Sequence, residues 1–281
     1  MRFEKWQALG NDYVIFEHGA LPWDLTPERV RRLCAPHVGI GADGILLISE
    51  ADDPRYLARV QIFNRDGSEA ELSGNGVREA VLYLGRANWT DPGSEFSILT
   101  KAGPIRATLT GRNTVTLAMG RASLTSPDYP SGPSDGAGTL SAGGHEWSFQ
   151  HISIGNPQCV IHAGDSVDEL DIGAIGPEIE RSELFPNRTN VSFIRVDGST
   201  VRARIFERGV GETLSSGTGA SAAAVAAVLR GSATPITVRL DGGDLTVDVT
   251  EDLEVRLTGT ASAVYRGELS GDLMAALGPS S

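Results

Sequence analysis

The chain has little cysteine and no long hydrophobic run. Cys34 and Cys159 are the only cysteines in 281 residues, so the sequence offers neither a disulfide framework nor a cysteine metal cluster. The five histidines lack H-x-H or H-x-x-x-H spacing, and no metal site is expected. No apolar run approaches the roughly 18 residues of a membrane span, and residues 1–10 lack a signal-peptide core. We therefore expect a cytoplasmic location.

Positive charge is also scarce. The sequence has 24 Lys and Arg against 36 Asp and Glu, a net charge of -12. Nucleic acid and anionic membrane surfaces would repel such a chain at long range, so neither is expected as a partner. The hydrophobic content of 40% is enough for a sizeable core, and the length favours two domains over one.

Strand patterns dominate what is present. Many short runs alternate in polarity or are rich in Val and Ile, and Gly, Asn or Asp separates them. Helix signals are fewer: an N-cap Thr26 followed by Pro27 predicts a helix over 26–33, and apolar segments cover 77–84 and 220–229. Residues 123–144 are rich in Pro, Gly and Ser, which predicts a loop or linker between two halves.

The two halves repeat one motif. Ser73 and Ser216 lie about half the chain length apart, each in the pattern Glu-x-x-x-Ser-Gly-x-Gly, with Glu69 and Glu212 leading. A strand pattern precedes each copy and an apolar helix pattern follows it. The repeat predicts a duplicated β-rich domain with one central helix in each copy.

A Gly-x-Gly turn at a helix start has a defined chemistry. It lets the backbone approach a ligand, and the first amide N–H groups point outward, where the helix dipole favours an anion. One such turn alone would indicate close packing of a strand on a helix. Two copies favour instead a carboxylate site with one helix from each domain. A P-loop is excluded because neither turn ends in Gly-Lys-Ser/Thr.

Six blocks spread along the chain resemble the diaminopimelate epimerase family, cofactor-independent amino-acid epimerases of lysine and cell-wall biosynthesis. These blocks are LGNDYVIFE, GIGADGILLI, FNRDGSEAELSGNGVR, IGNPQCVIH, FPNRTNVSFI and FERGVGETLSSGTGASAAAVA. The resemblance implies an α+β fold with two pseudo-symmetric β-barrel-like domains, each around a central helix, and an active site in the cleft between them. We predict one domain from 1–118 with 264–281 and a second from 119–263. The implied ligand is an amino acid, no cofactor is expected, and a homodimer is left open.

The resemblance also implies the site residues. In the family, two cysteines directly before the Gly-x-Gly turns act as acid and base, and Ser73 and Ser216 hold those positions here. Some members have Gln where this chain has Gly44. Arg suits a carboxylate, Glu an ammonium, and amides give oriented donors and acceptors. The implied substrate-binding residues are Asn11, Asn64, Gly74, Asn75, Asn156, Asn190, Glu207, Arg208, Gly217 and Thr218.

The two serines put the activity in question. A helix N-terminus brings a thiol from a pKa of about 8.5 into the physiological range. A serine hydroxyl is a far weaker acid, and a dipole worth roughly 0.3 to 2 kcal/mol does not close that gap at about 1.36 kcal/mol per pKa unit. Three hypotheses stay open: an inactive or weakly active diaminopimelate epimerase, a related racemase, dehydratase or isomerase, and a non-catalytic amino-acid-binding protein. The substitute bases in the second case are Glu69, Glu79, Glu212 and His151.

The sequence leaves open whether the serines are natural or engineered. Ser215, Ser221 and Glu79 depart from the family pattern as well. An experimenter who wished to trap substrate would have little reason to change those three positions. Natural divergence is therefore the favoured origin.

Overall fold

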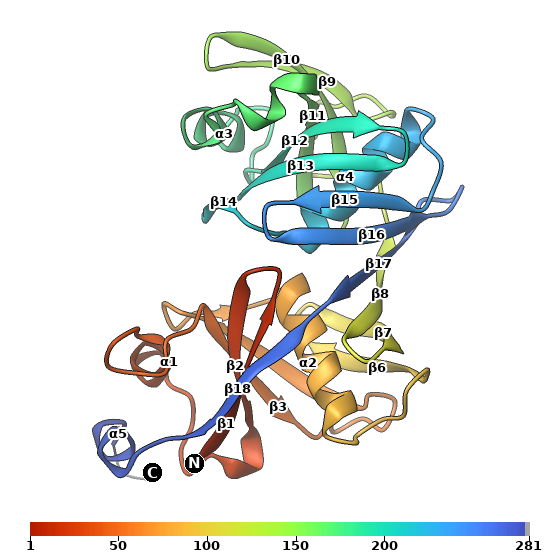
Figure 1. Ribbon diagram of the computed structural model, residues 1–281. Coiled ribbons are helices and arrows are strands. Elements are labelled where there is room, and N and C mark those ends of the chain that lie inside the picture. The colour runs from red at the N-terminus through yellow and green to blue at the C-terminus, as the bar shows by residue number, and fades with distance from the viewer. Residues whose placement is uncertain (279–281) are drawn as a thin grey trace. The chain divides into compact units, whose positions relative to one another are not determined.

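The computed structural model describes residues 1–278 as two compact units (Figure 1). The first unit is Met1–Leu117 with Gly259–Ser281, of which 279–281 lie outside the described residues, and the second is Ala118–Thr258. Strands β8 (Thr114–Arg121) and β17 (Glu254–Thr260) carry the chain from one unit to the other. The predicted boundaries differ from this division at Ala118 and at residues 259–263, of which Ser262 and Ala263 belong to β18 (Ser262–Glu268), which pairs with β1.

The first unit forms one run of hydrogen-bonded strands in the order β18-β1-β2-β3-β4-β6-β7-β8. The short β5 (Glu69–Ala70) lies beside β4 and leads into the central helix. The other elements are β1 (Arg2–Ala8), β2 (Asn11–Glu17), β3 (Gly44–Ser49), β4 (Ala58–Asn64), β6 (Glu95–Thr100), β7 (Gly103–Gly111), α1 (Pro27–Cys34), α2 (Gly74–Arg86) and α5 (Gly271–Ala276).

The second unit repeats this order as β9-β10-β11-β12-β13-β15-β16-β17. The short β14 (Gly211–Thr213) lies beside β13 and again leads into a helix. The other elements are β9 (Ala137–Ala142), β10 (His145–Ser153), β11 (Pro157–His162), β12 (Asn190–Asp197), β13 (Thr200–Glu207), β15 (Ile236–Leu240), β16 (Gly243–Val249), α3 (Ile172–Glu180) and α4 (Gly217–Leu229).

Strand directions match between the units. The pairs β2–β3 and β11–β12 are parallel, as are β4–β6 and β13–β15. The corresponding hairpins in both units are antiparallel. The predicted α+β fold with a repeated, sheet-rich architecture is therefore confirmed.

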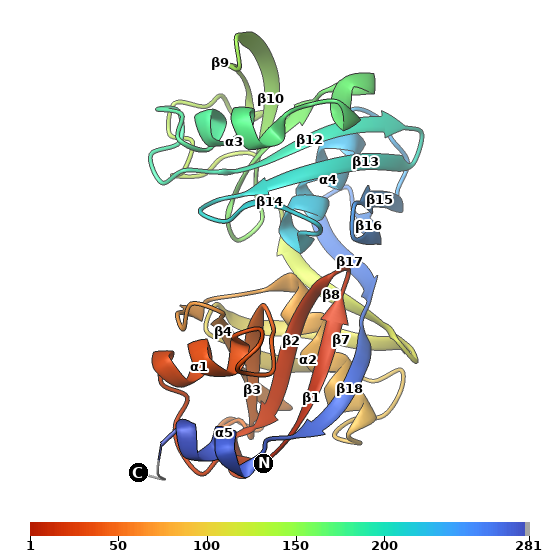
Figure 2. The same ribbon diagram turned by 60° about the vertical axis from the view of Figure 1, so that its left-hand side comes forward.

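One central helix packs inside the strands of each unit (Figures 1 and 2). Helix α2 contacts β1, β2, β3, β4, β7 and β18, and α4 contacts β10, β11, β12, β13, β15 and β16. Helix α4 consists mainly of small residues, with Ala or Val at eight of its 13 positions, and most of its residues are buried. Small side chains let strands approach α4 on several sides, which suits it to the centre of the second unit.

The segment 123–144 is only partly a loop. Residues 137–142 form β9, which pairs with β10. Leu140 and Ala142 from this strand, with Tyr129 just before it, are buried in the core of the second unit. The loop prediction was wrong for these residues because alternate Gly, Ser and Thr positions weaken the strand signal, whereas the partner β10 supplies the pairing.

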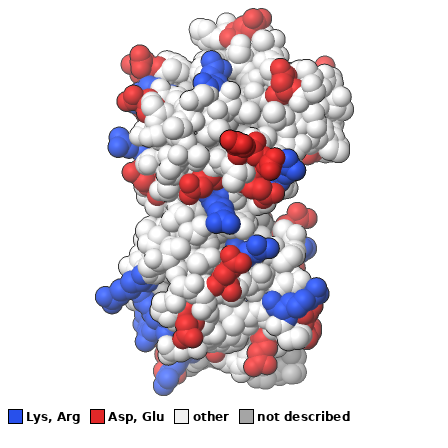
Figure 3. Space-filling view, turned by 90° about the vertical axis from the view of Figure 1, so that its right-hand side faces the viewer, with Lys and Arg blue, Asp and Glu red and all other residues white. Residues whose placement is uncertain are grey.

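Charges of both signs are interspersed on the face shown in Figure 3. The net charge of -12 is therefore not gathered into one acidic block on that face. Within residues 1–278, no helix is long and apolar enough to cross a membrane.

Candidate functional site

Ser73 is the N-cap of α2. Its backbone is extended (φ -137°, ψ 117°), and its Oγ accepts a hydrogen bond of 3.1 Å from the Gly76 amide. This cap satisfies one of the first-turn N–H groups, as Ser commonly does at this position. A second hydrogen bond reaches the same Oγ from the Tyr13 hydroxyl at 3.1 Å. The motif serine is thus held by the helix and by a side chain from β2.

A polar chain continues from the first turn of α2. The side-chain amide of Asn75 donates to Asn11 Oδ1 at 3.4 Å, and the side-chain amide of Asn11 donates to the Asp43 carboxylate at 2.9 Å. The Asp43 and Asp12 backbone amides each donate to the other residue's carboxylate. The structure therefore brings the predicted Asn11 and Asn75 together, close to Gly74.

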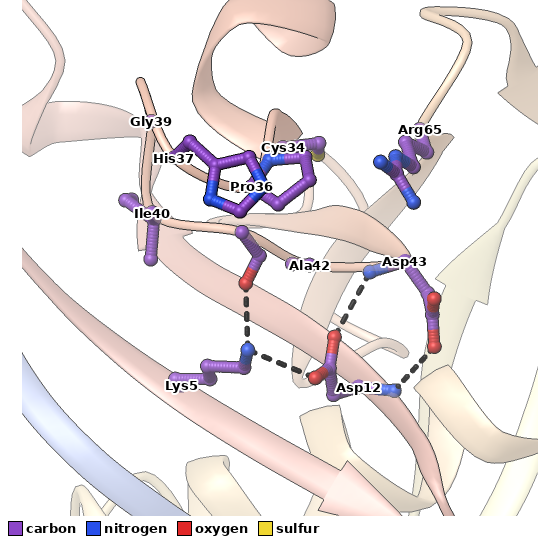
Figure 4. A pocket seen from close by; sticks show the side chains of 11 residues that line it. Lys5, Asp12, Cys34, Pro36, His37, Gly39, Ile40, Ala42, Asp43 and Arg65 are labelled. Carbon is purple, nitrogen blue, oxygen red and sulfur yellow. Dashed lines mark hydrogen bonds and ion pairs between the residues drawn. The ribbon is translucent and has the colours of Figure 1, made fainter.

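The loop before β3 lines a cavity of about 440 Å³ (Figure 4). Lys5 Nζ donates to the Gly41 carbonyl oxygen at 2.6 Å and lies 2.8 Å from an Asp12 carboxylate oxygen. Asp43, which is hydrogen-bonded to Asp12, and Arg65 also line the cavity. These paired charges fasten the glycine-rich loop to β1 and β2, and the loop in turn places Gly44.

Three strands of the first unit place Tyr13, Gly44 and Asn64 side by side. Tyr13 is the register partner of Gly44 in β2–β3, and Gly44 is the partner of Asn64 in β3–β4. Asn64 ends its strand exposed, and its amide donates to Ser68 at 3.0 Å. A Cβ at position 44 would overlap the Tyr13 ring and the Phe63 carbonyl oxygen. Glycine therefore leaves the space that the Tyr13 ring fills.

Ser216 repeats the cap at α4. Its backbone is again extended (φ -142°, ψ 124°), and Oγ accepts from the Gly219 amide at 3.3 Å. The partner from the sheet differs, because Ser216 hydrogen-bonds the side chain of Glu207 at the end of β13. Burial raises the Glu207 pKa above its ordinary value, and the Ser216 hydrogen bond partly offsets that rise.

The start of β11 reaches the first turn of α4. The side-chain amide of Asn156 donates to Thr218 Oγ1 at 3.3 Å, and the side-chain amide of Gln158 donates to the same oxygen at 3.2 Å. Gln158 also donates to Asn156 Oδ1 at 2.7 Å. The predicted Asn156 and Thr218 are therefore joined next to Gly217, and Gln158 connects them.

A tight turn after β13 holds Arg208. The backbone amide of Arg208 donates to Asn190 Oδ1 at 2.9 Å, and the backbone amide of Gly209 donates to the Glu180 carboxylate at 2.8 Å. Asn190 is buried and donates to the Pro157 carbonyl oxygen. The Arg208 guanidinium bonds the Asn187 carbonyl oxygen at 2.8 Å. The predicted trio Asn190, Glu207 and Arg208 thus lies at one end of β12 and β13.

Helix α2 carries two adjacent buried charges. Arg78 donates to Asn75 Oδ1 at 2.6 Å and to the Gly74 carbonyl oxygen at 3.2 Å. Burial lowers the Arg78 pKa to about 10, and Glu79 opposes this shift. Burial likewise raises the Glu79 pKa well above 4.5, opposed by Arg78. Burial therefore disfavours the ionised form of the Glu79 carboxyl group.

The other candidate substitute bases are committed elsewhere. Glu212 bonds Arg204 at 2.8 Å, and Glu69 lies 3.5 Å from Lys101. His151 is buried, and its Nε2 lies 2.9 Å from Ser126 Oγ. Burial lowers the His151 pKa. Neither hydrogen bonds nor ion pairs of the described residues tie these three side chains to Ser73 or Ser216.

Both cysteines are fully buried. Burial raises the pKa of Cys34 to about 12, and it also raises the pKa of Cys159. Neither residue lies at a helix start, so neither has the environment of a reactive thiolate. The interpretation of both as small buried residues is confirmed.

Family comparison covers most of the chain. The diaminopimelate epimerase family model matches residues 3–125 and 151–264. The chain belongs to this family. It is 39% identical over 283 residues to diaminopimelate epimerase 2 of Nostoc sp., covering 98% of each sequence. It is 38% identical to the diaminopimelate epimerase of Desulfitobacterium hafniense, covering 98% of this chain and 100% of that one.

Solved structures of other proteins share the fold. A probable proline racemase from Agrobacterium radiobacter matches with a TM-score of 0.69 at 17% identity, covering 96% of this chain and 93% of that one. A hydroxyproline epimerase from Agrobacterium vitis matches with a TM-score of 0.68 at 17% identity, covering 97% and 93%. At this identity the likeness shows the architecture alone, which this family member shares.

Sequence reasoning missed Tyr13, Gln158 and Glu180. Tyr13 and Gln158 stand at the same place in the repeat, two residues after the Asn of LGNDY and of IGNPQ. Aligning the two halves would have singled out both. Glu180 has no such signal, because it lies on α3 and meets the Arg208 turn only through the fold.

Proposed function

We propose that this protein is a cytoplasmic, cofactor-independent epimerase that interconverts LL- and meso-diaminopimelate, slowly because serines replace both thiols. The observation that carries the proposal is the repeated cap: in each unit a serine Oγ sits on the first turn of a central helix. Near full-length likeness to curated diaminopimelate epimerases supports the choice of substrate.

The geometry suits removal of an α-proton. Loss of that proton places charge on the adjacent carboxylate, and free first-turn amides with a helix dipole stabilise such charge. The proposed cradle is Gly74 and Asn75 in one unit and Gly217 and Thr218 in the other. General acid–base transfer then requires a group at the carbon, which we assign to Ser73 and Ser216.

The far end of the substrate carries a second ammonium and a second carboxylate. We assign the ammonium to Glu207 and the carboxylate to Arg208, because these side chains offer the opposite charges. Asn190 supports the assignment, since it holds the Arg208 backbone. Asn11, Asn64 and Asn156 complete the proposed polar contacts.

Solvent exchange tests the proposal. LL-diaminopimelate incubated with the protein in deuterated water should lose its α-proton signal in NMR spectra, whereas lysine and proline should keep theirs. Ser73→Ala and Ser216→Ala should each abolish epimerisation, and one of the two should also abolish exchange from the LL isomer, because each serine faces only one side of the α-carbon. Binding of diaminopimelate by calorimetry without any exchange would favour the amino-acid-binding protein instead. Exchange that survives Ser73→Ala but is lost in Glu79→Gln would favour a related enzyme with a carboxylate base.

A further inference from the structure

Two donors converge on Ser73 Oγ. The Gly76 amide and the Tyr13 hydroxyl each lie 3.1 Å from this oxygen. A hydroxyl group has two acceptor lone pairs and one proton to donate. Because both lone pairs accept hydrogen bonds, Ser73 can interact with a ligand by donating its hydroxyl proton.

A serine that transfers its hydroxyl proton to a substrate must receive another proton. An isolated serine alkoxide is essentially absent near neutral pH, because the hydroxyl is a weak nucleophile and acid without an activating partner. A tyrosine hydroxyl has an ordinary pKa of about 10 and is a much better acid. The Tyr13 hydroxyl donates a hydrogen bond to Ser73 Oγ at 3.1 Å.

We propose that Tyr13 is a positioning residue that supplies the proton which Ser73 passes on. As the Ser73 O–H bond breaks toward the substrate carbanion, the Tyr13 O–H bond breaks toward Ser73 Oγ. One proton reaches the carbon, the serine is restored, and the negative charge rests on the Tyr13 phenolate. In the reverse direction the phenolate takes a proton through Ser73. The transfer rests on the proposed epimerase function, whereas the Tyr13–Ser73 hydrogen bond does not.

The sheet keeps the tyrosine in place. Tyr13 is 5% exposed, and its ring lies over Gly44, where any side chain would collide with it. Ser216 has no comparable phenol: the register position of Tyr13 is taken by Gln158, which bonds Asn156 and Thr218 instead. The arrangement is therefore particular to the first unit.

Thiol titration tests the hydrogen bond without any substrate. Ser73→Cys places a thiol beside Tyr13, and its pKa can be read from the pH dependence of alkylation by iodoacetamide, localised by mass spectrometry. A donor to the thiolate lowers its pKa, so adding Tyr13→Phe should raise the Cys thiol pKa by about one unit. Tyr83→Phe is the matched control, because Tyr83 is a second phenol of the first unit and donates to Glu17 instead. An equal thiol pKa in the Tyr13→Phe and Tyr83→Phe variants would overturn the proposal.

Deuterium exchange from diaminopimelate tests the transfer. Tyr13→Phe should slow exchange at least about tenfold when Ser73 is present, since the relay is lost. In the Ser73→Cys background the same change should cost less than about threefold, because a thiol needs no relay. Equal losses in both backgrounds would show a merely structural role and overturn the transfer. If neither background exchanges, the proposed function fails, and the thiol titration still decides the role of Tyr13.

Discussion

The two serine-capped helix starts share a backbone but differ in the side chains around it. Tyr13 and Gly44 occupy the register positions held by Gln158 and Asn190 in the other unit. Extended caps and first-turn amides are the same in both units. The comparison teaches that the backbone of the helix start is the same in both halves, whereas the side chains around it are specific to each unit.

The helix interiors diverged as well. Arg78 of α2 and Ser221 of α4 both bond the carbonyl oxygen four residues earlier, at Gly74 and Gly217. At these positions and the next, α2 buries the ionisable Arg78 and Glu79, whereas α4 buries Ser221 and an alanine. Burial of an ionisable group is costly, so of the two central helices only α2 should make the stability depend on a buried titration.

The largest expected effect comes from restoring both thiols. Ser73→Cys/Ser216→Cys should speed α-proton exchange about 100-fold or more, because a thiol at a helix N-terminus is partly ionised and an alcohol is not. Either single variant should remove the α-proton from one stereoisomer only. NMR in deuterated water measures both rates. Ser215→Cys, one residue before a cap, is the control and should leave exchange unchanged.

The second largest expected effect is a loss of diaminopimelate affinity when the Arg208 side chain is removed. Arg208→Ala should weaken diaminopimelate binding about tenfold or more, on the scale of a lost charge-assisted hydrogen bond. Lysine lacks the second carboxylate, so its affinity should change little. Arg65→Ala, at the equivalent place after β4, is the matched control. Calorimetry that finds equal losses for both ligands would contradict the assignment of Arg208 to the distal carboxylate.

The buried Glu79 should give the smallest effect, on stability alone. Unfolding lets Glu79 ionise at its ordinary pKa of 4.5, whereas burial raises its pKa in the folded protein. The unfolded state therefore releases the proton first as pH rises, and the free energy of unfolding falls between these two pKa values. Glu79→Gln should remove that fall, each unit of pKa difference contributing about 1.4 kcal/mol. Urea unfolding at pH 4, 6 and 8 measures it, and parallel curves for both proteins would disprove it.

Much of the fold could be predicted from local patterns. The runs at Ala58–Asn64 and Thr200–Glu207 alternate clearly and form β4 and β13. Weaker patterns did not predict their elements: at β9 the small residues give little strand signal, and pairing with β10 forms the strand. Helix α3 was also missed, because its nine residues include Pro177 and two glycines, which weaken a helix signal.

The sequence by itself determined the repeated serine caps, since Ser before Gly-x-Gly and an apolar run is a local signal that needs no tertiary context. Tertiary structure alone decided which side chain meets each serine. Tyr13 lies 60 residues before Ser73 in the chain, and Glu207 reaches Ser216 from a different strand. The physical reason is register: pairing of β2 with β3 and of β11 with β12 sets which residues lie beside the helix start. No local pattern encodes that pairing.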